Sequence, residues 1–340
     1  MRRPKDRDFV ETKEGFFFCL VGYVHPPDRY TAYLKYTPAD AGSWARGNVF
    51  YRRELPYYHV RNVLKTLEAL ERQHPEYVWF DPVRSLKFSF VPKEAVARYY
   101  LPEERVAEIL RTPADPLEGA VKALAELLRT AAGIPQEVFG ITGSILLQLH
   151  NPAFSDIDLL VYGQDNAEKV KRAVEALKGG PIQELEPRRR EQWRAETAER
   201  FALGAQDVAY LEAKRWNYFL FEGRYTSILP TRLDAEIREE YGDHRYRGVG
   251  PATIEATVTD ATESIFLPAV FSVADVKFIE GVPRRLREVI SFEGLYCHIA
   301  DKGDQILAAG HVEEREDGSC RLVVGSAALR DGGFIKKRGP

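Results

Sequence analysis

The stretch 138–163, which reads VFGITGSILLQLHNPAFSDIDLLVYG, constrains the fold of this chain more than any other. It predicts a short apolar segment that ends at Gly143 and Ser144, one or two helical turns and, after a break, a strand that carries Asp156 and Asp158. Side chains two residues apart on a strand point to the same face, so both carboxylates should share one surface. Their neighbours are apolar, so at least one face of this strand should be buried.

The residue types in this stretch indicate phosphate and metal chemistry. Two carboxylates held close together repel each other and raise each other's pKa unless a cation lies between them, which favours a divalent metal. A glycine at position 143 lets the backbone turn tightly, and Ser144 at the start of a helix offers a hydroxyl beside free amide donors. Together these features are typical of phosphoryl or nucleotidyl transfer.

This pattern resembles the nucleotidyltransferase superfamily that includes DNA polymerase beta, CCA-adding enzymes and the minimal archaeal and bacterial nucleotidyltransferases. The shared features are Gly-Ser, a spacer of about ten residues, and Asp-x-Asp preceded by Ser155 and followed by an apolar strand. The resemblance implies that Gly143 and Ser144 hold the triphosphate of an NTP, and that Asp156 and Asp158 bind two Mg²⁺ ions. Basic residues that would then offset the triphosphate charge are Lys214, Arg215 and Arg224.

The superfamily also places a third carboxylate on a later strand, often a few residues before a proline. Alignment on Pro230 puts Ser227 at that position. A serine cannot deprotonate an attacking hydroxyl as a carboxylate can, nor bind a second metal with comparable charge. Asp207 and Asp234 are the nearest substitutes, although an exposed or capping role explains each of them as well. Without a third acid, the chain would bind nucleotide without transferring it, or would use a substrate that supplies the missing group.

The length of 340 residues exceeds that of one typical compact core and predicts two or three domains. We expect a multidomain α+β protein with an N-terminal α+β domain (1–112), a central nucleotidyltransferase α/β domain with a mixed sheet (113–247) and a C-terminal small all-β barrel or sandwich (248–340).

Within the first of these domains, alternating aromatic segments over 8–37 predict a three-stranded meander. Residues 38–58 resemble a long basic and aromatic loop, which can bind nucleic acid or pack on the meander. Residues 59–73 form an amphipathic pattern typical of a helix, and 92–110 are predicted to be helical with a break at Pro102.

In the remainder of the chain, helices are predicted over 117–131 and 166–177, and a hairpin over 216–232. The charged stretch 186–213 alternates in sign, which is typical of a solvated helix. Lone histidines such as His150 lack partners at metal-ligand spacing and are interpreted as structural.

Composition excludes some classes of protein. The net charge of −3 means that any nucleic-acid surface would be a local patch. The sequence contains no run of eighteen uncharged apolar residues and begins with charged sequence, so we expect a cytoplasmic protein without membrane contact. A single methionine and few amides are typical of thermophiles, although biased genomic base composition produces the same pattern.

Two hypotheses follow from the sequence. The first is a Mg²⁺-dependent nucleotidyltransferase that moves a nucleoside monophosphate from an NTP to an acceptor such as RNA and releases pyrophosphate. The alternative is an inactive nucleotidyltransferase fold that serves as an RNA- or ribonucleoprotein-binding module, motivated by Ser227 at the position of the third acid.

Overall fold

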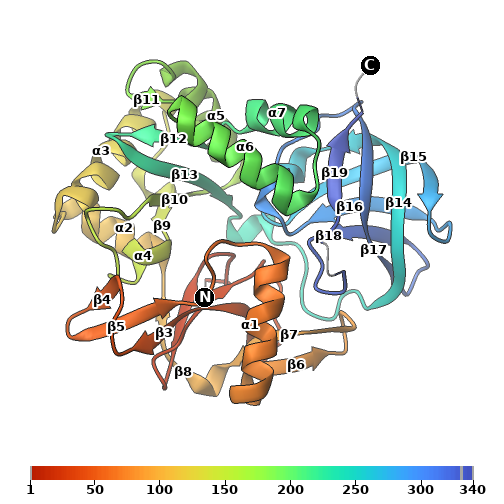
Figure 1. Cartoon of the computed structure of the whole chain (residues 1–340), viewed down its shortest axis with the longest axis horizontal. Coiled ribbons are helices and arrows are strands. Elements are labelled where there is room, and N and C mark those ends of the chain that lie inside the picture. The colour runs from red at the N-terminus through yellow and green to blue at the C-terminus, as the bar shows by residue number, and fades with distance from the viewer. Residues whose placement is uncertain (1, 330–331, 339–340) are drawn as a thin grey trace.

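The computed structural model describes residues 2–329 and 332–338. This part of the chain is α+β and multidomain, with seven α-helices and three sheets. In Figure 1 the first sheet lies at the bottom, the second sheet and most helices at the upper left, and the third sheet on the right. None of the helices in the described ranges is both long and apolar enough to cross a membrane.

The first sheet has eight strands and carries one long helix. Its main path is β4-β5-β3-β2-β1-β8, and β7 joins β3 to β6. The helix α1 (Val60–Gln73) forms because apolar residues recur every three or four positions and give it one buried face. The strands are β1 (Phe9–Thr12), β2 (Phe17–Leu20), β3 (Arg29–Ala39), β4 (Trp44–Arg46), β5 (Val49–Arg53), β6 (Val78–Asp81), β7 (Leu86–Pro92) and β8 (Val96–Tyr100).

The predicted meander and the amphipathic helix are confirmed here, but two other predictions are wrong. Residues 38–58 are not a long loop, because β4 and β5 pair as a hairpin around Gly47, which adopts a left-handed φ of 60°. Residues 96–100 are a strand that pairs with β1, not part of a helix. Pro102 begins α2 (Pro102–Arg111) instead of dividing a longer helix, as its missing amide proton allows at a first helical position.

The second sheet has the order β11-β12-β13-β10-β9. It is mixed, as the sequence predicts, because β10 and β13 run parallel while the other pairs are antiparallel. The helices α2, α3 (Pro116–Ala132) and α5 (Gln164–Leu177) share a hydrophobic core with it. The strands are β9 (Phe139–Ile141), β10 (Ile157–Tyr162), β11 (Ile182–Gln183), β12 (Tyr218–Phe221) and β13 (Arg224–Thr231), and the last two form the predicted hairpin.

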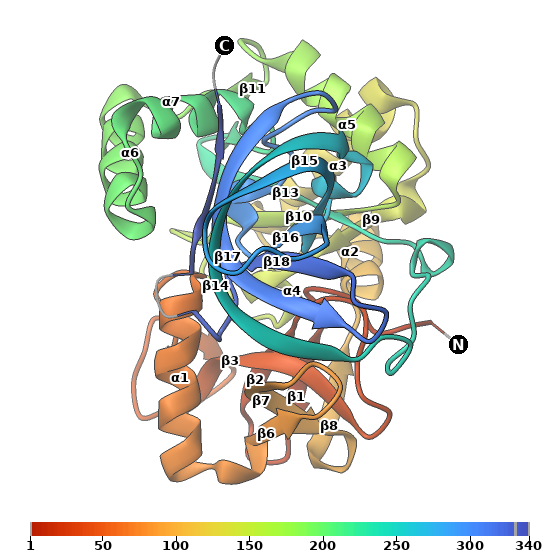
Figure 2. The same ribbon diagram turned by 90° about the vertical axis from the view of Figure 1, so that its right-hand side faces the viewer.

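The third sheet has six strands whose pairings return to their start. From β14 they run through β15, β16, β18 and β17, and β17 pairs with β14 again, while β19 extends from β17. Figure 2 shows how strongly these strands curve. The strands are β14 (Tyr246–Asp260), β15 (Ala269–Glu280), β16 (Leu286–Ser291), β17 (Gln305–Arg315), β18 (Cys320–Val324) and β19 (Phe334–Lys337).

Two further helices lie between β11 and β12 in the chain and pack against the core of the third sheet. The charged stretch 186–213 forms α6 (Pro187–Phe201) and α7 (Ala205–Lys214), separated at Gly204, instead of one helix. Val208 and Leu211 of α7 join the core of the third sheet. Most residues of α6 are exposed and Thr197 is the one that is buried, so the solvated character that the charge pattern predicts is confirmed for this helix.

One short helix joins the second sheet to the first. The helix α4 (Gly143–Leu146) directly follows β9, and Leu146, Leu147 and Leu149 at its end are buried among aromatic residues of the first sheet. This packing brings the predicted site of the second sheet against strands β3 and β5 of the first.

Candidate nucleotide and metal site

The predicted glycine turn lies directly beside one of the predicted carboxylates. Gly143 has a left-handed φ of 69°, and a Cβ atom added there would lie 2.7 Å from Oδ2 of Asp158. The amide of Thr142 donates a hydrogen bond of 3.0 Å to the backbone carbonyl of Asp158. Position 143 therefore requires a glycine for two reasons, its backbone conformation and the close approach of the carboxylate.

A tight turn places Asp156, the other predicted carboxylate, directly before β10. The amide of Asn151 donates to the hydroxyl of Ser155 over 2.9 Å, and the amide of Ser155 donates to the carbonyl of Asn151 over 2.9 Å. Asp156 follows this turn and precedes β10, which begins at Ile157. Asp156 and Asp158 therefore flank the first residue of the strand, close to the position that alternation predicts.

The two carboxylates influence each other electrostatically. Asp156 is an exposed residue, yet enough protein surrounds its carboxylate that burial, followed by the negative charge of Asp158, raises its pKa to about 6. Arg189, Arg53 and Arg224 act in the opposite direction and lower this pKa. Carboxylate oxygens that repel one another suit a hard divalent cation such as Mg²⁺, so the donor set fits this metal.

The strand register shows which residue lies beside Asp158 at the position expected for a third carboxylate. Asp158 on β10 lies directly opposite Ser227 on β13, because the two parallel strands pair with these residues in register. The hydroxyl of Ser227 donates a hydrogen bond to Oδ1 of Asp158. A serine hydroxyl therefore occupies the place beside Asp158 where alignment on Pro230 expects an acid.

Basic residues surround the carboxylates from two sides. Lys35 on β3 and Arg53 on β5 come from the first sheet; the charge of Asp158 raises the pKa of Lys35, and Arg53 acts on Asp156. Arg224, at the start of β13, and Arg189 on α6 approach Asp156 from the second sheet and its flanking helix. Arg189 lies over the ring of Tyr225, 5.4 Å from its centre.

These four cations lack carboxylate partners. Across residues 2–329 and 332–338, none of Lys35, Arg53, Arg189 and Arg224 forms an ion pair, and Nε of Arg53 is buried without a hydrogen bond. Burial lowers the pKa of Lys35, as expected for an ammonium group without a close partner. The site therefore combines two carboxylates with cations that the protein itself does not neutralise.

The structure distributes the three predicted triphosphate-binding cations differently. Arg224 is at the site, as described above. Arg215 stacks on the rings of Trp193 and Tyr218, at 4.4 and 3.8 Å from their centres. Lys214 forms an ion pair of 2.8 Å with Asp301, which places its ammonium group toward the third sheet.

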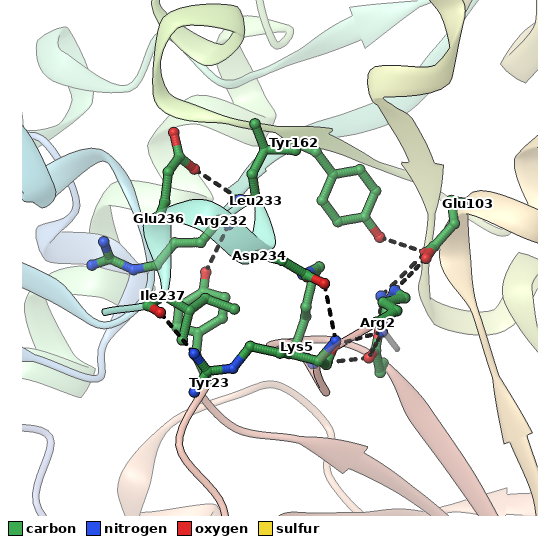
Figure 3. Close-up of polar contacts among 12 residues, drawn as sticks. Arg2, Lys5, Tyr23, Glu103, Tyr162, Arg232, Leu233, Asp234, Glu236 and Ile237 are labelled. Carbon is green, nitrogen blue, oxygen red and sulfur yellow. Dashed lines mark hydrogen bonds and ion pairs between the residues drawn. The ribbon is translucent and has the colours of Figure 1, made fainter. Parts of the chain in front are cut away.

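The two substitutes for the third acid are engaged elsewhere. Asp207 accepts a hydrogen bond from the amide of Gly204 at the start of α7 and pairs with Lys336 at 2.9 Å. Figure 3 shows Asp234 directed toward the N-terminal segment, where it pairs with Lys5 and accepts a 3.2 Å hydrogen bond from the amide of Arg3. Asp207 therefore caps a helix and forms an ion pair, and Asp234 binds the N-terminal segment.

A second acidic cluster lies in the same domain. Ligand atoms of Asp115, Glu118 and His150 lie within 4.8 Å of one another. Nε2 of His150 is 2.7 Å from Asp115, and Glu118 pairs with Arg105. Asp115 also caps α3 through the amides of two residues in its first turn. These partners support the structural interpretation of His150.

Sequence patterns did not identify the contribution of the first sheet. Lys35 lies within the predicted meander, and Arg53 within the stretch 38–58 that the sequence predicts to be a long loop. Nothing in the local sequence links either residue to carboxylates more than a hundred positions away. The one available signal was the density of arginine and aromatic residues over 38–58, which also fits simple packing.

Comparisons with known proteins give one relative. The chain is 29% identical over 341 residues to "Uncharacterized protein MJ1086" of Methanocaldococcus jannaschii, and the match covers 97% of this chain and 98% of that protein. No protein-family model matches the chain, and no solved structure matches it.

Proposed function

We propose that this protein is a metal-dependent nucleotidyltransferase, which moves a nucleoside monophosphate from an NTP to an acceptor and releases pyrophosphate. The observation that carries the proposal is the close approach of Gly143 to Asp158, with Asp156 beside them and four unpaired cations around them. Fixed positive charge close to a carboxylate pair is the combination that a triphosphate and its metal require.

In this proposal each residue has a defined task. Asp156 and Asp158 would hold Mg²⁺, which supplies charge neutralisation for the phosphate oxygens. The absence of a side chain at Gly143 leaves room beside Asp158, and the hydroxyl of Ser144 is half-buried at the start of α4. Lys35 and Arg53, which lie on the side of α4, would bind the β- and γ-phosphates.

Calorimetric titration of ATP, GTP, CTP and UTP, with and without Mg²⁺, tests the proposed nucleotide site. We expect Mg²⁺-dependent binding that is lost in the double variant Asp156→Ala, Asp158→Ala. A circular-dichroism spectrum of the double variant serves as the folding control. If no NTP binds to the wild-type protein, the proposal is wrong.

A second candidate function is binding of RNA without catalysis. Two observations favour it: the hydroxyl of Ser227 beside Asp158, and the third sheet, whose pairing of β14 with both β15 and β17 supports a closed small barrel. Barrels of this size often bind oligonucleotides. This candidate predicts RNA affinity that decreases steeply with salt and is unchanged in Asp156→Ala, whereas loss of RNA binding in that variant argues against it.

A further inference from the structure

The cations around the carboxylate pair come from two parts of the molecule, the first sheet and the pair of elements α6 and β13. Lys35 and Arg53 lie on the side of α4, because α4 packs its leucines into the core of the first sheet. Arg224 and Arg189 lie on the side of β13, the strand that also carries Ser227. The two groups therefore reach the carboxylates from different elements, one from β3 and β5 of the first sheet and the other from α6 and β13, the strand next to β10.

The β13 side has no general base. Ser227 directs its proton to Asp158, and a hydroxyl is too weak a base to deprotonate another hydroxyl at neutral pH. Within the described residues, the group of three potential metal ligands whose atoms all lie within 4.8 Å of one another is Asp115, Glu118 and His150, so Asp156 and Asp158 form no such group with a third acid or histidine. A neutral hydroxyl acceptor would meet arginines here, and the carboxylates beside them, Asp156 and Asp158, are the proposed metal ligands.

We propose that the acceptor is a phosphomonoester, and that Arg189 and Arg224 bind its phosphate. This inference rests on the proposed nucleotidyl transfer and names the substrate class of the same site. A phosphomonoester oxygen is already anionic at neutral pH, so no base is needed to generate the nucleophile. Guanidinium groups bind phosphate through paired hydrogen bonds, which makes arginine a suitable residue at this position.

The proposed reaction balances without a proton transfer. An electron pair on the phosphomonoester oxygen forms a bond to the α-phosphorus of the NTP. The bond between the α-phosphorus and the oxygen that bridges it to the β-phosphorus breaks, and pyrophosphate leaves with that electron pair. The product carries the nucleoside monophosphate in a new phosphate–phosphate anhydride.

Matched acceptors test this inference directly. The full-length protein is incubated with Mg²⁺ and each NTP labelled at the α-phosphate, together with ribose 5-phosphate, glucose 1-phosphate, glycerol 3-phosphate or a 5′-phosphorylated oligoribonucleotide. The same four compounds without phosphate serve as controls. We expect labelled product, resistant to phosphatase, with rates about 100-fold higher or more for the phosphorylated member of a pair. The small compounds and the oligonucleotide distinguish a metabolite from an RNA end as the source of the phosphate.

Two results would overturn the inference. One is transfer to a hydroxyl compound at a rate equal to that of its phosphorylated partner. The other is Mg²⁺-dependent NTP binding without product from any phosphorylated acceptor. If NTP binding itself is absent, the proposed function fails first and this inference fails with it.

Variants on the β13 side test the division of the cations. We expect Arg189→Gln and Arg224→Gln each to raise the KM for the phosphorylated acceptor about tenfold, while the Kd for Mg²⁺-NTP stays within about twofold. Arg188→Gln is the matched control, because Arg188 is the exposed neighbour of Arg189 on α6 and should change neither constant. Weaker NTP binding with an unchanged acceptor KM would overturn the assignment.

Discussion

The central domain contains two clusters of acids that differ in what neutralises them. Glu118 accepts hydrogen bonds from Arg105 and from the amide of Ala114, and Asp115 accepts from two amides and contacts His150. Asp158 accepts a hydrogen bond from Ser227, and the cations that act on Asp156 and Asp158 form no ion pair within the described residues. Acids whose hydrogen bonds and ion pairs are all formed within the chain stabilise the fold. Acids and cations that lie close together without pairing are suited to bind a charged ligand.

The substitution Asp158→Asn tests the proposed ligand-binding role of Asp156 and Asp158, and its expected effect is the largest. The amide keeps a hydrogen bond to Ser227 but loses the charge that would hold the metal, so we expect the transfer rate to decrease about a thousandfold. The free energy of unfolding in urea should not decrease, because repulsion of Asp156 is removed. Lower stability together with retained transfer would assign Asp158 to the fold instead.

Glu118→Gln tests the structural side. Arg105 would lose its buried partner, so we expect the free energy of unfolding to decrease by about 3 kcal/mol, measured in urea. The Kd for Mg²⁺-NTP should stay unchanged. Glu126→Gln is the matched control, since Glu126 is an exposed glutamate on the same helix α3. If Glu118→Gln leaves stability intact but abolishes metal binding, the cluster of Asp115, Glu118 and His150 binds the metal and its structural assignment is wrong.

Glu293 extends the comparison to a buried acid that has no ion pair with any described residue. Burial raises its pKa from 4.5 to about 8, and the amide of Val60 is its hydrogen-bond donor. The folded state then binds more protons than the unfolded state between these values, so its contribution to stability is complete below pH 4.5 and is lost as the pH rises through about 8.

The measurement is urea unfolding at a series of pH values. We expect a decrease of at most about 1.4 kcal/mol per pH unit in the wild type, and a flatter profile in Glu293→Gln. The same slope in both proteins would show that Glu293 is ionised in the folded state.

Arg53→Ala gives the smallest expected effect and asks whether the first sheet belongs to the site. Removal of one unpaired cation should weaken Mg²⁺-NTP binding about fivefold, or about 1 kcal/mol, in calorimetric titration. Arg52→Ala is the control, because Arg52 is exposed and already pairs with Glu54. Equal behaviour of the two variants would restrict the site to the second domain.

The part of the site that was predictable from sequence is the part that local backbone geometry determines. Gly143 and Ser144 follow one strand, Asp156 and Asp158 begin the next, and alignment on Pro230 placed Ser227 directly beside Asp158. Strand alternation and register depend on neighbours in the chain or on one pairing, so short patterns encode them.

The remaining part depends on packing between domains. Lys35 and Arg53 reach the carboxylates only because the leucines of α4 insert into the first sheet, a contact that no periodicity records. The same limit applies to Asp234 and Asp207, whose partners Lys5 and Lys336 are distant in sequence. Side chains that many environments accept, such as surface acids and arginines, carry little information about their partners.

The docking of α4 on the first sheet has a consequence for how the chain would respond to its ligand. A triphosphate held by Gly143 and Ser144 on one side and by Lys35 and Arg53 on the other would contact two domains at once. Triphosphate binding would then stabilise the association of these domains, since a ligand that binds only the assembled form shifts the equilibrium toward that form. Nucleotide binding and the assembly of the first two domains would be one coupled equilibrium, and a chain with a misplaced first domain would not retain the nucleotide.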